Sequence, residues 1–272
     1  MQENDNNSTI NRRRVLATLG AAGVAGLAGC GSSSNASVGE PSEKDVPPPS
    51  VDAANRWELT TPNSETRLLY EGSQLGIEFT AHGHTVQYAD KQLRQRISEN
   101  TFGEVDREFA VAFAARIDIF PSYASSGTAA FGDTIESAIT DNLRSSMEEF
   151  GVQNVIEDGR MEASNTPADD VSVLRGEYPI NQVTIRDVNI PHSDREQLSF
   201  GDGTLPIKGI AGRWKSGGSI MAAGGVYPDE PFIEENEVEM SDAVTLSMEI
   251  NLGLNPTQRE NQVLEFIDSV SR

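Results

Sequence analysis

The chain has 272 residues, of which 37% are hydrophobic and 6% aromatic, so it is long enough to bury a substantial core. Its 42 acidic residues outnumber its 21 basic residues. The resulting net charge of -21 argues against a nucleic-acid partner, because no basic stripe is present to neutralise phosphates. Cys30 is the only cysteine, which excludes an intramolecular disulfide.

The first 29 residues have the order of a signal peptide. A polar start and the basic Arg12-Arg13-Arg14 precede a run of small apolar residues from Val15 to Ala28. As a helix this run would span only about 21 Å, short of the ~30 Å hydrocarbon core of a membrane. A cleaved signal is therefore favoured over a permanent transmembrane helix.

Two short motifs refine this interpretation. Arg12 and Arg13, one residue removed from Val15-Leu16, resemble the twin-arginine export signal, which carries folded proteins across a membrane. Leu27-Ala28-Gly29-Cys30 resembles a lipobox, in which the cysteine becomes the mature N-terminus and carries lipid. Each buried CH₂ of a lipid chain contributes about 0.8 kcal/mol, so two chains hold a protein stably. The resemblance implies a lipid anchor at Cys30.

Residues 30–55 are predicted to form the lipidated Cys30 and a disordered tether. The stretch is rich in Ser, Pro, Gly and charge, and it contains too few large apolar groups to offset its ordering entropy. Asn35-Ala36-Ser37 is an N-glycosylation sequon on this exposed segment. The remaining residues, 56–272, are predicted to form a single globular domain.

The domain begins with strand patterns and a short helix. Segments 74–79 and 85–88 favour β structure and predict a hairpin that turns at Gly83. Leu93 and Ile97, four residues apart, predict a helix over 90–98. Apolar residues then alternate over much of 109–120, which predicts a long strand.

A second helix is predicted over 133–150, where apolar residues share one face. Strands dominate after it. They are expected at 154–161, 171–178, 182–188, 205–214, 219–227 and 243–252. Gly217-Gly218 predicts a hairpin turn between two of them. Asn255-Pro256 then starts a C-terminal helix that runs to about Val270.

These elements predict an α+β fold. We expect an antiparallel sheet covered on one face by two or three helices, including the C-terminal helix. The arrangement is loosely similar to PsbP/Mog1-like folds. That similarity concerns the fold alone and implies no function.

His82-Gly83-His84 is the main candidate for metal chemistry. On an extended strand, residues two apart point to the same face, so both imidazoles could share a transition metal with His192 or a carboxylate. The alternative is a polar hairpin tip, in which Gly83 makes the turn and both rings are solvated. The second interpretation is favoured, so we predict no metal site and no cofactor.

Other segments carry weaker signals, each with a plain structural explanation. Residues 122–128 could present backbone amides to an anion, although an ordinary loop is favoured. Residues 200–204 could be a calcium-like turn, although a β-turn is favoured. We interpret the acidic stretch 228–239 as a solvated surface. Trp57 and Trp214 could mark a binding patch, although packing in the core is favoured.

The whole chain resembles haloarchaeal twin-arginine-exported lipoproteins of uncharacterised function. The resemblance is carried by residues 12–30 and by an acidic composition in which only four of the basic residues are lysine. Such acidity is tolerated in concentrated salt because the Debye length falls to about 3 Å at 1 M. The resemblance implies lipid anchoring through Cys30 at the extracellular face of the cell membrane. It supplies no active-site residues.

Three functions remain as hypotheses. No residue set forms a catalytic motif, so the leading hypothesis is a non-enzymatic module that binds an unknown surface partner. The first alternative is a surface hydrolase that uses carboxylates alone, which would require two facing carboxyls of raised pKa. The second alternative is a lipoprotein that captures a small solute for a transporter, which usually requires two lobes.

Overall fold

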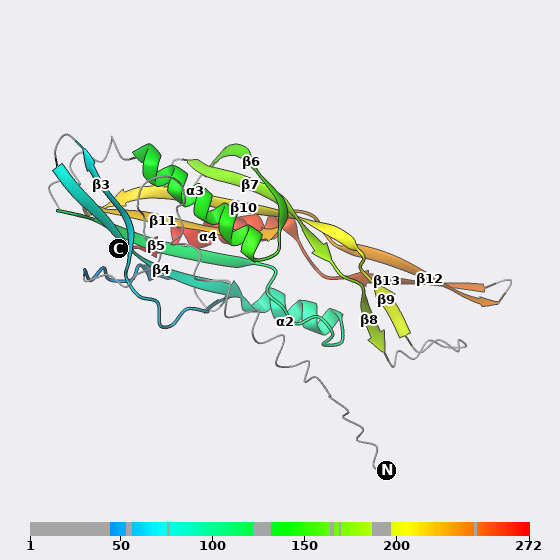
Figure 1. Ribbon diagram of the computed structural model, residues 1–272. Coiled ribbons are helices and arrows are strands. Elements are labelled where there is room, and N and C mark those ends of the chain that lie inside the picture. The colour runs from blue at the N-terminus through cyan, green and yellow to red at the C-terminus, as the bar shows by residue number, and fades with distance from the viewer. Residues whose placement is uncertain are drawn as a thin grey trace, which may run out of the picture.

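An eight-stranded antiparallel sheet forms the body of the molecule, shown as a computed structural model in Figure 1. The structure describes residues 44–52, 56–74, 77–121, 132–163, 166–168, 170–186, 197–241 and 244–272. The strand order is β2-β4-β5-β11-β10-β7-β6, with β3 paired to β4. These strands are β2 (Trp57–Leu59), β3 (Arg67–Gln74), β4 (Ile77–Asp90), β5 (Val111–Phe120), β6 (Gln153–Glu162), β7 (Asp170–Ile180), β10 (Gly203–Ser216) and β11 (Ser219–Pro228).

Helices lie on both faces of this sheet, which corrects the expectation of a sheet covered on one face (Figure 1). The helices are α2 (Lys91–Asn100), α3 (Gly132–Glu149) and α4 (Pro256–Asp268). Gly209 faces Met147 of α3, whereas Gly225 faces Val263 of α4. Gly225 pairs with Ile210, the residue after Gly209, and successive strand residues point to opposite faces. The two helices therefore cover opposite faces of the sheet.

Small residues in the central strands allow this double coverage. Every residue of β11 is buried. A Cβ added to Gly224 would lie only 2.2 Å from the carbonyl oxygen of Ile210. Ala222 and Ala223 of the same strand are almost completely buried. The Ala- and Gly-rich sequence thus lets neighbouring layers approach closely, as dense interior packing requires.

The helices and one turn confirm the sequence prediction closely. Asp90 caps α2 by accepting a hydrogen bond from the Leu93 amide, and Asn255 caps α4 in the same way from Gln258. Gly217 and Gly218 form the predicted turn between β10 and β11, with φ angles of 54° and 90° that suit glycine. The α+β fold with a C-terminal helix is therefore confirmed.

The predicted turn at Gly83 was wrong. Gly83 lies inside the continuous strand β4, and the hairpin partner of that strand is β3. A Cβ at position 83 would lie 2.4 Å from Cδ1 of Leu69, so the glycine makes room for a packed leucine. Glycine here serves close packing within the sheet and does not reverse the chain.

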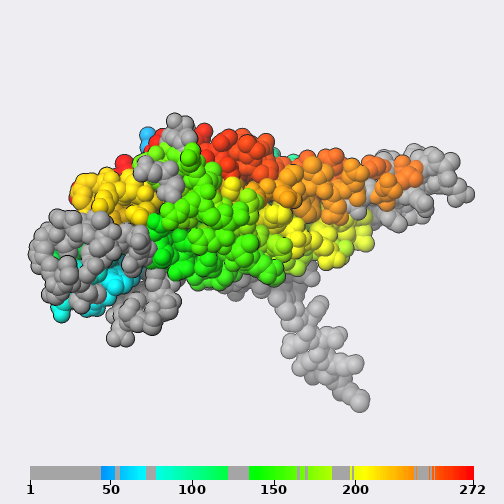
Figure 2. All heavy atoms as spheres, turned by 90° about the horizontal axis from the view of Figure 1, so that it is seen from above, coloured from blue at the N-terminus to red at the C-terminus, as the bar shows by residue number. Residues whose placement is uncertain are grey.

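Two hairpins project from one end of the body and form what we call the arm (Figures 1 and 2). One hairpin is β8 (Val183–Arg186) with β9 (Gln197–Phe200), and the other is β12 (Ile233–Ser241) with β13 (Val244–Asn251). Strands β9 and β12 were not predicted. The acidic stretch expected to be only a solvated face contains β12.

The segment 44–52 packs on the body, so part of the expected tether belongs to the domain. Val46 is completely buried, and its amide and carbonyl both bond Oγ1 of Thr66. β1 (Ser50–Val51) pairs with β14 (Val270–Ser271), which directly follows α4. The expected domain start at residue 56 is therefore too late, because a buried valine and backbone pairing order the preceding segment.

A buried ion cluster connects three distant segments of the body. Asp90 is 2% exposed and lies between Arg56 and Arg259. Arg259 of α4 is 1% exposed and donates a 2.7 Å hydrogen bond to the carboxylate. Removing one partner from such a cluster would leave a buried charge without compensation. The cluster therefore fixes α4 against the start of α2.

Candidate ligand-binding site

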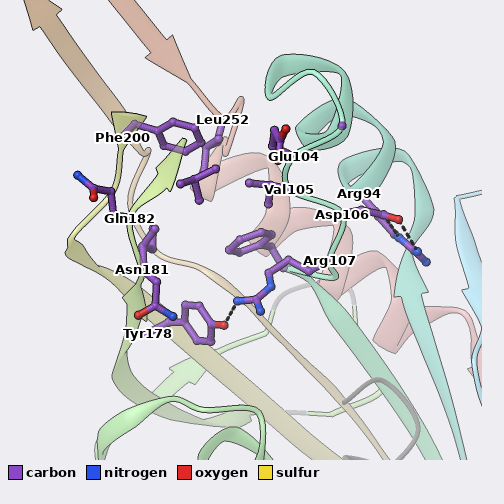
Figure 3. A pocket seen from close by; sticks show the side chains of 14 residues that line it. Arg94, Glu104, Val105, Asp106, Arg107, Tyr178, Asn181, Gln182, Phe200 and Leu252 are labelled. Atoms are coloured by element: carbon purple, nitrogen blue, oxygen red, sulfur yellow. Dashed lines mark hydrogen bonds and ion pairs between the residues drawn. The ribbon is translucent and has the colours of Figure 1, made fainter. Parts of the chain in front are cut away.

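A cavity of about 480 Å³ lies where the arm leaves the body (Figure 3). Its volume falls in the ordinary range for small-molecule sites. Four parts of the chain line this junction cavity: Arg94 in the first turn of α2 with the loop that follows the helix, the end of β7 with the start of β8, the end of β9, and the residue after β13. The lining side chains that matter below are Val105, Asp106, Arg107, Phe109, Tyr178 and Phe200.

One side of the junction cavity is apolar and rigid. Phe109 is 7% exposed, Phe200 is 2% exposed and Leu252 is 1% exposed, so all three are fixed in the core. The ring of Phe109 meets that of Tyr178 edge to face, with centroids 6.2 Å apart. These buried side chains form a rigid floor, and the half-buried Val105 and Val183 beside them leave apolar surface that a ligand can cover.

The opposite side carries a cation held by an aromatic ring. The guanidinium of Arg107 donates a hydrogen bond to the hydroxyl of Tyr178, and its central carbon lies 5.4 Å from the centroid of that ring. Figure 3 shows both side chains directed toward one another across the cavity. Within the part of the chain that the structure describes, Arg107 forms no ion pair with a carboxylate.

Arg94 and Asp106 form a separate ion pair at the edge of the cavity. Nε of Arg94 lies 2.6 Å from Oδ1 of Asp106. The hydrogen bond from Arg94 holds the pKa of Asp106 below its ordinary value despite partial burial, so this carboxylate stays ionised. An ionised carboxylate cannot act as a general acid.

The base of the arm is tied to the body beside the cavity. The amide of Gly201 donates to a carboxylate oxygen of Glu234 at 2.8 Å, which links the two hairpins. Gly201 has φ 97°, and a Cβ there would lie 2.7 Å from the carbonyl oxygen of Asn181. Asp202 has φ 71°, and its amide N–H donates a hydrogen bond to the carbonyl oxygen of Ile180. This tight connection, predicted as a β-turn, joins β9 to β10.

Three exposed apolar side chains lie close to residues that line the cavity. Phe102 follows α2 and is 78% exposed with φ 53°, a left-handed conformation that is unfavourable for a residue with a Cβ. Ile233 at the start of β12 is 52% exposed. Phe150 is 40% exposed, and its ring lies 6.3 Å from that of Tyr178. Exposed apolar groups beside a cavity are typical of binding surfaces.

The predicted histidine pair lies elsewhere, on β4. His82 and His84 share a strand face, as expected, but each ring already has polar partners. His82 Nε2 lies 2.9 Å from Oγ1 of Thr80, and burial lowers the pKa of His82. His84 lies within 3.0 Å of both Ser64 and the Val46 carbonyl. The expected solvated hairpin tip was therefore wrong, because an ordered segment covers this part of the strand.

No metal-binding group is present in the described ranges: nowhere do three His, Cys, Asp or Glu side chains come close enough to hold an ion.

The predicted packing of both tryptophans is confirmed. Trp57 meets Phe266 edge to face at 5.4 Å, and Trp214 packs against the main core. Arg12, Arg13, Cys30, Asn35, His192 and segment 122–128 lie outside the described residues.

A second cavity of about 160 Å³ lies beneath α3. Arg160 and Arg213 line this cavity, and the guanidinium groups of both contact the carboxylate of Glu136. These ion pairs attach α3 to β6 and β10.

In the part of the chain that is described, no helix has the length and apolarity needed to cross a membrane.

Comparison with known proteins identifies a family but no activity. No curated protein and no solved structure matches the chain. Residues 44–271 match the family described as Domain of unknown function (DUF6517). This match covers the whole body and arm and begins at residue 44, in the segment before β1. The chain therefore belongs to the DUF6517 family.

Proposed function

We propose that this protein is a lipid-anchored surface module that binds a ligand in the junction cavity without transforming it. Cys30 would carry the anchor, Arg12 and Arg13 would direct export, and the outer face of a haloarchaeal cell membrane would be its location. The lipobox and twin-arginine resemblance supports this half of the proposal. The cavity supports the other half.

One observation carries the binding role: a preformed cavity combines a rigid apolar side with an arginine that has no carboxylate partner among the described residues. Ligand sites ordinarily combine apolar walls with a few fixed polar groups. The left-handed Phe102 beside the cavity adds to this picture, because strained backbone and exposed aromatic surface concentrate at functional sites.

The binding role is tested with a panel of small aromatic and aliphatic carboxylates, amines and neutral amides. Chemical shifts of the purified protein's backbone amides are followed in molar KCl. We expect some members of the panel to shift the amides of 103–109 and 178–183. Gln182→Trp should fill the cavity and abolish those shifts, because the exposed Gln182 lines it. Gln95→Trp, on the exposed face of α2, is the matched control and should leave binding intact.

A panel that leaves those amides unmoved would contradict the binding role. Equal binding to the protein and to Gln182→Trp would place the site elsewhere and contradict it as well.

The anchor is tested by Cys30→Ser. The substituted precursor should stay uncleaved or release protein into the medium, because the thioether to lipid cannot form. Mass spectrometry of the native N-terminus should show a lipid-modified cysteine. An intact N-terminus with a free thiol, or unchanged membrane retention of Cys30→Ser, would contradict lipid anchoring.

Capture of a small solute for a transporter is not favoured over this role. The body is built on one eight-stranded sheet, and the described residues do not form two lobes around a cleft. The junction cavity is instead open beside an arm, which fits recognition of a group presented by a larger partner.

A further inference from the structure

The chemistry of Arg107 distinguishes it from most arginines in this acidic protein. Salt bridges to Asp or Glu are formed by Arg56, Arg94, Arg116, Arg144, Arg160, Arg175, Arg213 and Arg259. Arg107 instead uses a tyrosine hydroxyl and a ring face, and it lines the largest cavity described above. Arg107 therefore places a cation without a carboxylate partner inside this cavity, in a chain of net charge -21.

Tyr178 orients this guanidinium without neutralising it. One nitrogen of Arg107 donates to the hydroxyl, and the aromatic face supports the cation from the side. The remaining N–H groups stay available to an incoming acceptor. Because the side chain is already held in place, a ligand would lose little of its binding free energy in ordering it. A planar guanidinium of this kind matches a carboxylate, which it can bind through two parallel hydrogen bonds.

The surroundings restrict the charge of the ligand. Glu104 and Asp106 also line the cavity, and Asp106 is ionised and paired with Arg94. One available cation beside two acidic residues can compensate a single negative charge but would disfavour a dianion such as a phosphate monoester. The site therefore fits a monoanion.

The apolar side restricts the rest of the ligand. The half-buried Val105 and Val183 line the same cavity as Arg107, so a ligand whose anion meets the guanidinium can cover them with an apolar stem. A cavity of about 480 Å³ accommodates an aromatic or branched group of that kind. Asn181 and Gln182 add exposed amide groups along the same lining.

We propose that the junction cavity binds a monocarboxylate carried on an apolar stem, with Arg107 as the residue that recognises the carboxylate. This inference rests on the proposed binding role and specifies its ligand class. A free apolar acid and the C-terminal carboxylate of a peptide ending in an apolar residue share this chemistry.

The test compares probes that differ only in charge. Dissociation constants for 3-phenylpropionate and 3-phenylpropanamide are measured by chemical-shift titration in molar KCl. Hydrogen bonds to charged groups contribute about 1.5–3 kcal/mol. We therefore expect the carboxylate to bind about ten- to a hundredfold more tightly than the amide. The peptide Gly-Gly-Phe with a free or amidated C-terminus forms a second arm, and the tighter of the two carboxylates identifies the source.

Variants of the pair assign the preference to Arg107. Arg107→Met should reduce carboxylate affinity to that of the amide while leaving the amide unchanged. Arg144→Met, which removes a partly exposed arginine of α3 that does not line the cavity, is the control and should change neither affinity. Tyr178→Phe keeps the ring but removes the hydroxyl that holds Arg107, so it should weaken the carboxylate preference without abolishing it. It provides a second test if Arg107→Met is poorly folded, and a preference unchanged in Tyr178→Phe would contradict the positioning of Arg107. Melting temperatures of all variants report folding directly.

The outcomes separate the two proposals. Equal affinities for carboxylate and amide, with the Gln182→Trp block still effective, would overturn the carboxylate inference and leave the binding role standing. A carboxylate preference that survives Arg107→Met in a folded protein would overturn the role of Arg107. Failure of every probe to bind at the cavity would overturn both the inference and the proposed function.

Discussion

The body and the arm use the same strand geometry but opposite kinds of residue. Strand β11 of the body is buried along its whole length, and a helix covers each face of the sheet around it. The arm consists of two separate two-stranded hairpins, and Glu235, Glu237 and Glu249 on one of them are exposed. Isolated hairpins are marginally stable in water. Stability therefore resides in the body, and the arm depends on its attachment.

The difference between the body and the arm indicates where a ligand-binding site can arise in this fold. The junction cavity lies where the two hairpins meet the body, and Ile185, Phe200 and Ile250 bury the inner ends of those hairpins in the main core. Exposed lining residues such as Asn181 and Gln182 can be selected for binding with limited cost to folding. Gly201 and Glu234 connect the two hairpins at this point, and Asn100 of α2 bonds the carbonyl of Asn251 at the end of β13. A ligand seated there would contact both the body and the arm.

Breaking the ion cluster of the body should have the largest effect. Asp90→Asn keeps a good N-cap for α2 but leaves Arg259, which is 1% exposed, without a carboxylate. We expect a loss of about 3–5 kcal/mol in the free energy of unfolding, measured by denaturant titration in molar KCl. Asp141→Asn removes the exposed partner of Arg144 and should cost less than about 0.5 kcal/mol. Similar losses for the two variants would contradict the large contribution of the buried ion cluster to the stability of the body.

Overpacking the centre of the sheet should rank second. Gly224→Ala would place a Cβ 2.2 Å from a carbonyl oxygen of β10, and backbone cannot move aside cheaply. We expect a loss of about 2–3 kcal/mol, seen as a lower denaturation midpoint. The same change at Gly203, where a Cβ would meet nothing within 4 Å, should be nearly neutral. A neutral Gly224→Ala would show that the central layer is not closely packed.

Acid should weaken the attachment of α4 by a smaller amount. Burial tends to raise the pKa of Glu260, but hydrogen bonds from Lys208 and Tyr227 outweigh it, so the pKa lies below 4.5. A depressed folded-state pKa stabilises the protein above the ordinary pKa, and this contribution is lost as pH falls through the lower folded-state value. Unfolding curves between pH 6 and about 3 should therefore show a steeper decline for the native protein than for Glu260→Gln. Parallel curves would contradict the contribution of this carboxylate.

Changing the charge of the arm should have the smallest effect. Glu235 and Glu249 face each other across β12 and β13, and like charges directly opposite are destabilising. Glu235→Lys should raise stability at low ionic strength by about 0.5 kcal/mol, and the gain should vanish in molar KCl as screening removes the repulsion. A gain that persists in molar salt would mean that packing, and not charge, limits this hairpin.

Local patterns in the sequence predicted most of the body and little of the site. The helices α2, α3 and α4 and the turn at Gly217 follow from apolar spacing, capping residues and glycine pairs. β12 was missed because its many glutamates resemble a solvated loop. Gly83 was misplaced because a glycine that admits Leu69 looks identical in sequence to a glycine that turns the chain.

The candidate site could not be predicted because its residues are brought together only by the fold. Arg107, Tyr178, Phe200 and Leu252 are far apart in the sequence, and none belongs to a recognisable motif. One local signal existed: Phe102 follows directly after the last turn of α2, where a helix ordinarily ends in glycine. An aromatic residue in that position indicates a surface feature with a purpose beyond folding.

Amide hydrogen exchange of the whole protein, with and without 3-phenylpropionate, tests the central claim most directly. The account predicts slow exchange throughout β5, β10 and β11, fast exchange in β12 and β13, and protection by the probe confined to residues 101–109, 178–183 and 200–203. An arm as protected as the body would contradict the division of roles. Probe protection at the far end of β4, or none at all, would contradict the placement of function at the junction.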